Sequence, residues 1–280
     1  MIYESTIPTT RACTALEMKR SSFYSWKSRT ASQEGNQAIR DAIHQIALEF
    51  PGYGYRRITA QLHRQGTLAN HKRVLTIMQI EHLLCKRKSF KPHTTNSNHD
   101  EPLYPNLTKN IVVTRLNQLW VADITYISLA LGFVYLATIL DRFSRKCIGW
   151  ALSRRIDTQL SLDALEKAIT ERAALGFDGL IHHSDRGVQY AAHLYTTRLE
   201  SIGARPSMTE TGNPRENAHA ESFFKTLKVE EVYLKAYENF EDTYHNIKTF
   251  IDDVYNAKRL HSSIGYRPPN EMETEVLNIR

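Results

Sequence analysis

Residues 118–128 read QLWVADITYIS, and this run decides the class of fold. β-branched and aromatic residues fill it, which predicts a strand, and Asp123 stands in its middle. Two further runs follow at short intervals, FVYLATILDRF (133–143) and RKCIGWALS (145–153). Strands joined by such short links pair antiparallel, so this part of the chain predicts a three-stranded meander.

Helix and strand alternate after the meander. The expected elements, in chain order, are a helix capped by Asp157 or Thr158, a fourth strand in GLIHHSD (179–185), a helix around 191–202, a loop in RPSMTETGNPREN (205–217) and a long helix in NAHAESFFKTLKVEEVY (217–233). This order predicts an α/β layer fold, with a core over residues 111–230 and a helical tail over residues 231–280.

Three carboxylates in this core are candidate metal ligands and catalytic residues. Asp123 lies in the first strand, Asp185 ends the fourth, and Glu221 lies one turn into the long helix. The first and fourth strands are expected to be neighbours, with the helix packed across their ends. Three ionised carboxylates at one point repel one another and require a counter-charge, for which Mg²⁺ is suited by its preference for oxygen ligands. Two such ions would clamp the attacking and leaving oxygens of a phosphoryl displacement.

The spacing of these residues favours the catalytic interpretation. Taken singly, a strand aspartate, a turn aspartate and a helical glutamate each have an ordinary structural explanation. However, 35 residues separate Asp185 from Glu221, and Lys228 follows Glu221 by seven positions. Seven positions return to the same helix face, where Lys228 and its neighbour Lys225 are expected to contact DNA phosphates.

The basic residues are concentrated in the front of the chain. Residues 1–110 hold 16 Lys and Arg against 8 Asp and Glu, a net +8, whereas residues 111–280 hold 20 against 22, a net −2. A basic front joined to a slightly acidic back indicates a polyanion-binding part attached to a part that uses carboxylates.

Short amphipathic helices are expected in this front part. Residues 1–35 are consistent with a small helix-turn-helix or with a plain helical hairpin. Residues 36–84 predict three helices, of which the first begins at Gln37 and the third is capped by Asn70. They form either a DNA-binding unit or a bundle with a solvated basic face; the first interpretation is favoured. Residues 85–110 predict a basic, polar linker. The expected DNA contacts here are Arg56, Arg57, Lys72, Arg73, Lys86, Arg87 and Lys88.

Composition excludes several other classes. No run of about 18 uncharged apolar residues is present, so no membrane span is expected. The start of the chain lacks the apolar region of a secretory signal. The three cysteines lie far apart, which excludes an ordinary zinc knuckle or disulfide framework and favours a reducing cytoplasm.

Three segments resemble the catalytic blocks of bacterial insertion-sequence transposases, which belong to the retroviral-integrase-like superfamily: WVADITYI (120–127), HHSDRGVQY (182–190) and NAHAESFFKTLK (217–228). More narrowly, the chain is similar to the second-reading-frame products of the IS-three family. YNAKRLHSSIGYRPPNE (255–271) resembles the C-terminal signature of that group, and YGYRRI (53–58) resembles its helical N-terminal region. These matches extend over residues 36–271.

The resemblance implies an RNase H-like core that depends on Mg²⁺, with Mn²⁺ as a substitute, and that cuts and joins double-stranded DNA at the terminal inverted repeats of an element. It makes Asp123, Asp185 and Glu221 the metal ligands and places Lys228 near the DNA end. It further implies a homo-oligomer in the active complex and a first-reading-frame helix-turn-helix protein, as a partner or a fusion. A bacterial, nucleoid-associated location follows from this.

Several alternatives stay open at this stage. A nuclease of the same fold would hydrolyse DNA without joining it, and a DNA-binding regulator would have lost the chemistry. Asn256, Arg259 and His261 fall on the tail motif, where packing and capping is the favoured role. Adjacent side chains on a strand point to opposite faces, so a zinc site at the neighbouring histidines 182 and 183 is not expected.

Overall fold

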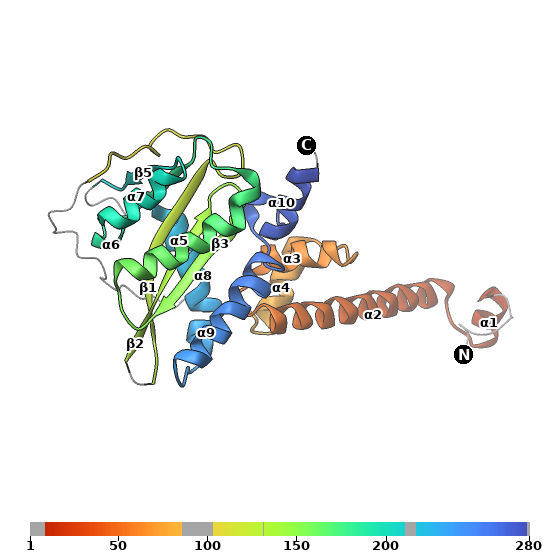
Figure 1. Cartoon of the computed structure of the whole chain (residues 1–280). Coiled ribbons are helices and arrows are strands. Elements are labelled where there is room, and N and C mark those ends of the chain that lie inside the picture. The colour runs from red at the N-terminus through yellow and green to blue at the C-terminus, as the bar shows by residue number, and fades with distance from the viewer. Residues whose placement is uncertain (1–8, 86–102, 131, 211–216, 279–280) are drawn as a thin grey trace. The chain divides into compact units, whose positions relative to one another are not determined.

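The structure is a computed structural model that describes residues 9–85, 103–130, 132–210 and 217–278; of residues 12 and 26–36 only the backbone is described (Figure 1). The chain divides into two compact units, residues 1–86 and 87–280, and each is described by itself. None of the helices in the described ranges combines the length and the apolar composition that crossing a bilayer requires.

The first unit is helical. Its elements are α1 (Thr9–Ala15), α2 (Arg20–Glu49), α3 (Tyr55–Arg64) and α4 (His71–Ile80). The helix expected from Gln37 is the second half of the continuous helix α2, so a separate start at this position is wrong. Asn70 caps α4 as predicted, because its side-chain oxygen accepts a hydrogen bond of 2.9 Å from the Lys72 backbone N–H. Ile58 and Leu62 of α3 are buried, as is Val74 of α4.

The second unit is built on one five-stranded sheet. Its strands are β1 (Leu119–Ser128), β2 (Phe133–Asp141), β3 (Cys147–Ser153), β4 (Ile181–Ser184) and β5 (Arg205–Met208). The spatial order is β3-β2-β1-β4-β5, in which β1, β2 and β3 pair antiparallel and β4 pairs parallel with both β1 and β5. This confirms the predicted meander, the neighbouring first and fourth strands, and the RNase H-like arrangement.

Strand β5 is a correction to the sequence-based prediction, which assigned residues 205–208 to a loop. The segment RPSM is too short to show an alternating pattern and contains a proline. Proline is tolerated in an edge strand, and β5 is the edge strand beside β4. Its pairing is fixed by tertiary contact, beginning with the Arg205 backbone N–H that donates to the Leu180 carbonyl at 2.9 Å.

Helices cover both faces of this sheet. One face packs against α5 (Thr158–Arg172), α6 (Val188–Ala191) and α7 (His193–Ser201). The other packs against α8 (Ala218–Glu230), α9 (Phe240–Thr249) and the π-helix Phe250–Asn256 that continues α9. Short 3-10 helices, Ala173–Leu175, Val232–Leu234 and Ser262–Ile264, and the last helix, α10 (Pro269–Asn278), complete the unit.

The two cores explain why β1 reads as an almost continuous apolar run. Trp120 and Ala122 belong to the core under α5 and α7, whereas Leu119 and Val121 belong to the core under α8 and α9. A strand that is covered on both faces has apolar residues at successive positions. Asp123 is the polar exception, and the alternation of strand side chains directs it to the face of α8.

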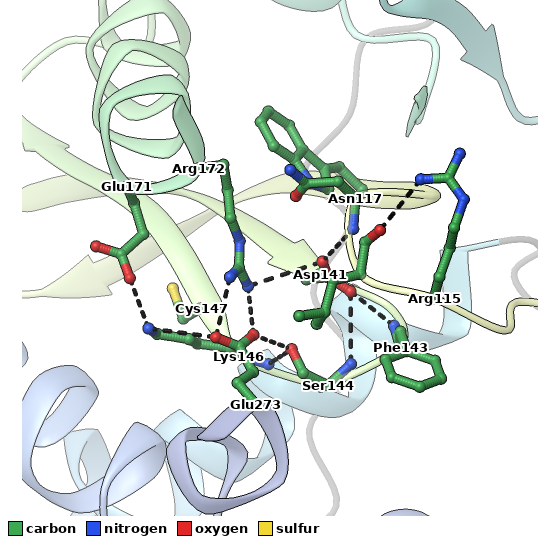
Figure 2. A network of polar contacts seen from close by, with 12 residues as sticks. Arg115, Asn117, Asp141, Phe143, Ser144, Lys146, Cys147, Glu171, Arg172 and Glu273 are labelled. Carbon is green, nitrogen blue, oxygen red and sulfur yellow. Dashed lines mark hydrogen bonds and ion pairs between the residues drawn. The ribbon is translucent and has the colours of Figure 1, made fainter. Parts of the chain in front are cut away.

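A buried ionic network joins the end of β2, the end of α5 and helix α10 (Figure 2). The Arg172 side chain at the end of α5 donates to both carboxylate oxygens of Glu273 in α10, one of these bonds being 2.9 Å long, and lies 3.7 Å from the Asp141 carboxylate at the end of β2. These three side chains are 2%, 5% and 0% exposed. One cation therefore lies between two carboxylates, and removal of Glu273 deprives the buried Arg172 guanidinium of both hydrogen bonds to that residue and leaves it only the Asp141 carboxylate at 3.7 Å.

Replacement of Glu273 by Ala should therefore lower the free energy of unfolding of this unit by about 3–5 kcal/mol. Urea unfolding followed by tryptophan fluorescence measures it, because Trp120 and Trp150 lie in the sheet. Glu275→Ala is the matched control: it removes the same side chain from the same helix, but its ion pair with Arg267 is exposed and contributes less than about 1 kcal/mol. Equal losses in the two variants would contradict the assigned role of the network.

Candidate catalytic site

The pairing of β1 with β4 brings two of the predicted carboxylates together. Val121 pairs with His183, and continuing this parallel register by two residues places Asp123 beside Asp185. Val121 and Ile181 both belong to the core under α8. Because strand side chains alternate, positions 123 and 185 are directed to that same face.

Helix α8 packs on this same face of the sheet and carries the third carboxylate. Its N-cap residue, Asn217, is buried and donates a hydrogen bond of 3.1 Å from Nδ2 to the carbonyl oxygen of Ala122, directly before Asp123. Glu221 follows in the first turn of α8 and is exposed. Phe223, Phe224 and Leu227 hold the helix on the sheet.

The charges of these residues act on one another. Burial first, then Asp185 and Glu221, raise the pKa of Asp123 well above its ordinary value, against the opposing effects of the Ile124 backbone N–H and of Lys228. The Asp123 carboxylate accepts a hydrogen bond of 2.8 Å from that N–H. A carboxylate held among other carboxylates is stable in its charged form only when a cation compensates it.

Lys228 lies on the same side of α8 as Glu221, as the seven-residue spacing predicts. Its ammonium group lies 4.9 Å from the centroid of the Tyr126 ring on β1, a cation–π distance. Burial lowers its pKa, and Asp123 raises it in part. Lys225 is exposed one turn before it.

The segment after β4 fixes the second aspartate. The Gly187 backbone N–H donates to Asp185 Oδ1 at 3.0 Å. A side chain at position 187 would meet that same oxygen, since a Cβ built there lies 3.0 Å from it. Tyr190 is buried behind this turn, and burial, followed by Tyr195, Asp123 and Asp185, raises the pKa of its phenol well above the ordinary value.

The three carboxylates do not form a closed set of metal ligands. Within the described ranges, no group of three Asp, Glu, His or Cys side chains is close enough to hold a metal ion. The two histidines of β4 take opposite faces: His182 Nε2 lies 3.0 Å from the Tyr195 hydroxyl, and His183 Nδ1 lies 2.9 Å from the Ser207 hydroxyl.

The other predicted DNA contacts lie in the first unit. Arg56, Lys72 and Arg73 are exposed on α3 and α4, and Arg57 is half-buried. The guanidinium groups of Arg56 and Arg57 lie 5.2 and 5.7 Å from the ring centroids of Tyr55 and Tyr53. Three further predicted contacts, Lys86, Arg87 and Lys88, lie outside the described residues.

The three residues of the tail motif make structural contacts. The Asn256 amide is paired with the backbone of Cys147 on β3, with distances of 3.0 and 2.9 Å. Arg259 donates two bonds of 2.8 Å to Glu230 at the end of α8. The His261 and Tyr255 rings meet edge to face, with centroids 4.8 Å apart. These contacts agree with the packing interpretation.

Sequence reasoning missed three residues of this site. Asn217 has the residue type of a helix cap, but the contact with β1 is tertiary and leaves no local signal. Tyr126 and Tyr190 read as ordinary core aromatics. Only the folded structure shows that Tyr126 lies beside Lys228, and that Tyr190 on α6 is near enough to Asp123 and Asp185 for their charges to add to the rise in pKa that burial causes.

Family models match most of the chain. Residues 113–214 and residues 202–269 match the model described as an integrase core domain, and residues 34–90 match an HTH-like domain.

Two curated relatives are similar over nearly their whole length. The transposase for insertion sequence element IS904 of Lactococcus lactis subsp. lactis (strain IL1403) is 36% identical over 86% of this chain and 95% of the relative. The transposase InsF for insertion sequence IS3A of Escherichia coli (strain K12) is 32% identical over 95% of this chain and 93% of the relative.

Among solved structures, the chain is similar to a simian T-cell lymphotropic virus intasome, with a TM-score of 0.45, 18% identity, and coverage of 76% of this chain and 69% of that chain. The identity and coverage of the two curated relatives show the family of this protein. The chain belongs to the insertion-sequence transposases, which are DDE-type polynucleotidyl transferases with an integrase core domain.

Proposed function

We propose that Asp123, Asp185 and Glu221 are the catalytic residues of this transposase and that they cut and join DNA strands at the ends of the element. One observation carries this proposal. The register of β1 and β4 sets the two aspartates side by side, and both Asp185 and Glu221 act on the charge of Asp123. Carboxylates that lie near one another and raise the pKa of a buried member are typical of functional sites.

The donor set suits a hard divalent cation. All three side chains offer oxygen, which Mg²⁺ prefers and Mn²⁺ accepts. The pKa of Asp123 is raised first by burial and then by the charges of Asp185 and Glu221, and a bound cation would offset the effect of those charges. When bound, two such ions supply the positive charge that stabilises the attacking and leaving oxygens of the displacement.

The protein's own residues position the DNA strand. Lys228, held over Tyr126 and close enough to Asp123 to affect its charge, is placed to bind a phosphate beside the carboxylates. Lys225 extends the same face of α8 toward solvent. Asn217 keeps the first turn of α8, and with it Glu221, over the end of the strand pair.

The substrate is double-stranded DNA, first the terminal inverted repeats and then the target. The HTH-like unit contributes its exposed basic residues on α3 and α4 to this binding. Both ends of an element are processed together, which requires a homo-oligomer. A first-reading-frame helix-turn-helix protein, separate or fused, completes recognition of the ends.

Replacement of Asp123, Asp185 or Glu221 by its amide should reduce strand cleavage and joining by at least about 10²-fold, because each amide removes a charged ligand. Labelled element ends, a target plasmid and Mg²⁺ provide the assay, and DNA binding should be retained. Glu200→Gln removes an exposed charge from α7 and serves as the control. An amide variant that cuts at the normal rate would remove that residue from the proposed set. Nicks without joined products in the unaltered protein would indicate a nuclease.

The stability of the protein should also report on Asp123. Its pKa is raised in the folded state, so the folded state binds the proton more tightly and the unaltered protein loses stability as the pH rises from the unfolded pKa through the folded pKa. The Asp123→Asn variant has no ionisable group at this position, so it does not lose this stability as the pH rises. Without metal, the variant should therefore be the more stable protein at neutral pH, and the difference should shrink on acidification.

Addition of Mg²⁺ should reverse that order, because only the unaltered protein gains stability from binding the ion. Urea unfolding at several pH values, with EDTA or with Mg²⁺, measures both effects. An Asp123→Asn variant that is less stable than the unaltered protein at every pH, or that gains as much from Mg²⁺, would contradict the proposal.

A further inference from the structure

The turn between β2 and β3 carries two arginines next to the catalytic site. Arg142 and Arg145 lie in residues 142–146, a turn closed by the Asp141 backbone N–H donating to the Lys146 carbonyl at 2.9 Å and by the Arg145 N–H donating to the Asp141 carbonyl at 2.8 Å. The Arg142 N–H donates to the carbonyl of Leu119 on β1 at 3.0 Å. The turn is therefore part of the sheet and not a free loop.

Hydrogen bonds to the buried ionic network hold this turn in place (Figure 2). The Asp141 carboxylate accepts hydrogen bonds from the backbone N–H groups of Phe143, at 2.8 Å, and Asn117, at 2.9 Å. The Ser144 hydroxyl donates to Glu273 at 2.5 Å. Asp141 and Glu273 are thus engaged with Arg172 and with the turn's own backbone, and they offer no ion pair to Arg142 or Arg145.

Arg145 also reaches the beginning of helix α8. Its Nη1 donates to Nδ1 of His219 at 2.6 Å. A guanidinium group has donors and no acceptor, so Nδ1 must accept and the remaining proton of the imidazole must lie on Nε2. The pair therefore presents only donors to a ligand: the other N–H groups of Arg145 and the Nε2–H of His219.

Two positive charges lie close together in this turn. Burial lowers the pKa of Arg145 and of Arg142, and the charge of Arg142 lowers that of Arg145 further. No ion pair joins either side chain to an Asp or Glu of the described ranges. Two half-buried guanidinium groups that repel each other are unfavourable until an anion neutralises them.

We infer that Arg142, Arg145 and His219 form a binding site for a phosphate of the DNA backbone, separate from the phosphate contact of Lys228. Guanidinium groups bind phosphate oxygens through paired donors. The location suits this ligand. His219 precedes Glu221 by two residues, and Arg142 is bonded to Leu119, four residues from Asp123, or roughly 13 Å along the strand. Because the ligand is placed by its nearness to the proposed catalytic residues, this inference rests on the proposed function.

The salt dependence of DNA binding tests this site. The full chain, carrying Asp123→Asn so that DNA is not cut, is titrated in EDTA against a fluorescein-labelled duplex of arbitrary sequence at several salt concentrations. Each lost phosphate contact lowers the slope of log K against log[salt] by ~0.9. Arg145→Gln and Arg142→Gln should each lower the slope by that amount, and Arg145→Lys, which retains the charge, should restore it. Arg205→Gln, an exposed arginine on β5, is the matched control.

The outcomes separate the alternatives. Slopes for Arg142→Gln and Arg145→Gln equal to that of Arg205→Gln would overturn the inference and leave Arg145 a structural tie to α8. Arg142 has no side-chain hydrogen bond within the described residues, so its variant remains informative even where Arg145→Gln lowers the melting temperature. Failure of the catalytic proposal is distinct, since it appears as DNA cutting by Asp123→Asn in Mg²⁺ and leaves the slopes unchanged.

Discussion

The parallel pairing of β1 with β4 is the interaction on which the site depends. It joins residues that lie about sixty positions apart in the chain, and its register decides which side chains meet. A shift of one residue would turn Asp185 to the opposite face of the sheet, away from Asp123 and α8. Contacts specific to each face of β4 oppose this shift, because His182 is paired with the Tyr195 hydroxyl of α7 and His183 with the Ser207 hydroxyl of β5. The packing of the sheet therefore sets the chemistry of the site.

Helix α8 completes the arrangement because it is held at both ends. Asn217 ties its start to the carbonyl of Ala122, and Arg259 of the tail motif binds Glu230 in its last turn. Between these points the helix carries Glu221 and Lys228 over β1. The tail motif thus has a physical role in the site without touching it: it fixes the end of the helix that presents the third carboxylate.

Much of this arrangement could be predicted from the sequence. The meander, the capped helices and the positions of the three carboxylates follow from local patterns and from the spacing of 35 residues between Asp185 and Glu221. Strand β5 could not be predicted, because a four-residue edge strand is decided by its pairing with β4 and not by local preference, and the local pattern at Gln37 does not show that α2 is continuous through Gly35. The contacts of Asn217 and Tyr126 depend on how α8 packs on β1, which no local pattern encodes.

The buried ionic network and the carboxylates of the candidate catalytic site differ in the charges that surround them. The Arg172 guanidinium lies between the carboxylates of Glu273 and Asp141. Its hydrogen bonds lower the pKa of Glu273, although burial alone would raise it, whereas burial raises the pKa of Asp141 and Arg172 offsets this only in part. Asp123 has like charges beside it and its pKa is raised. The first group joins the end of β2 to α5 and α10, and the second gathers like charges beside Asp123. Since α5, α10 and the turn at 142–146 meet in the first group, the ionic network and the candidate catalytic site are joined through the same two strands, β1 and β2.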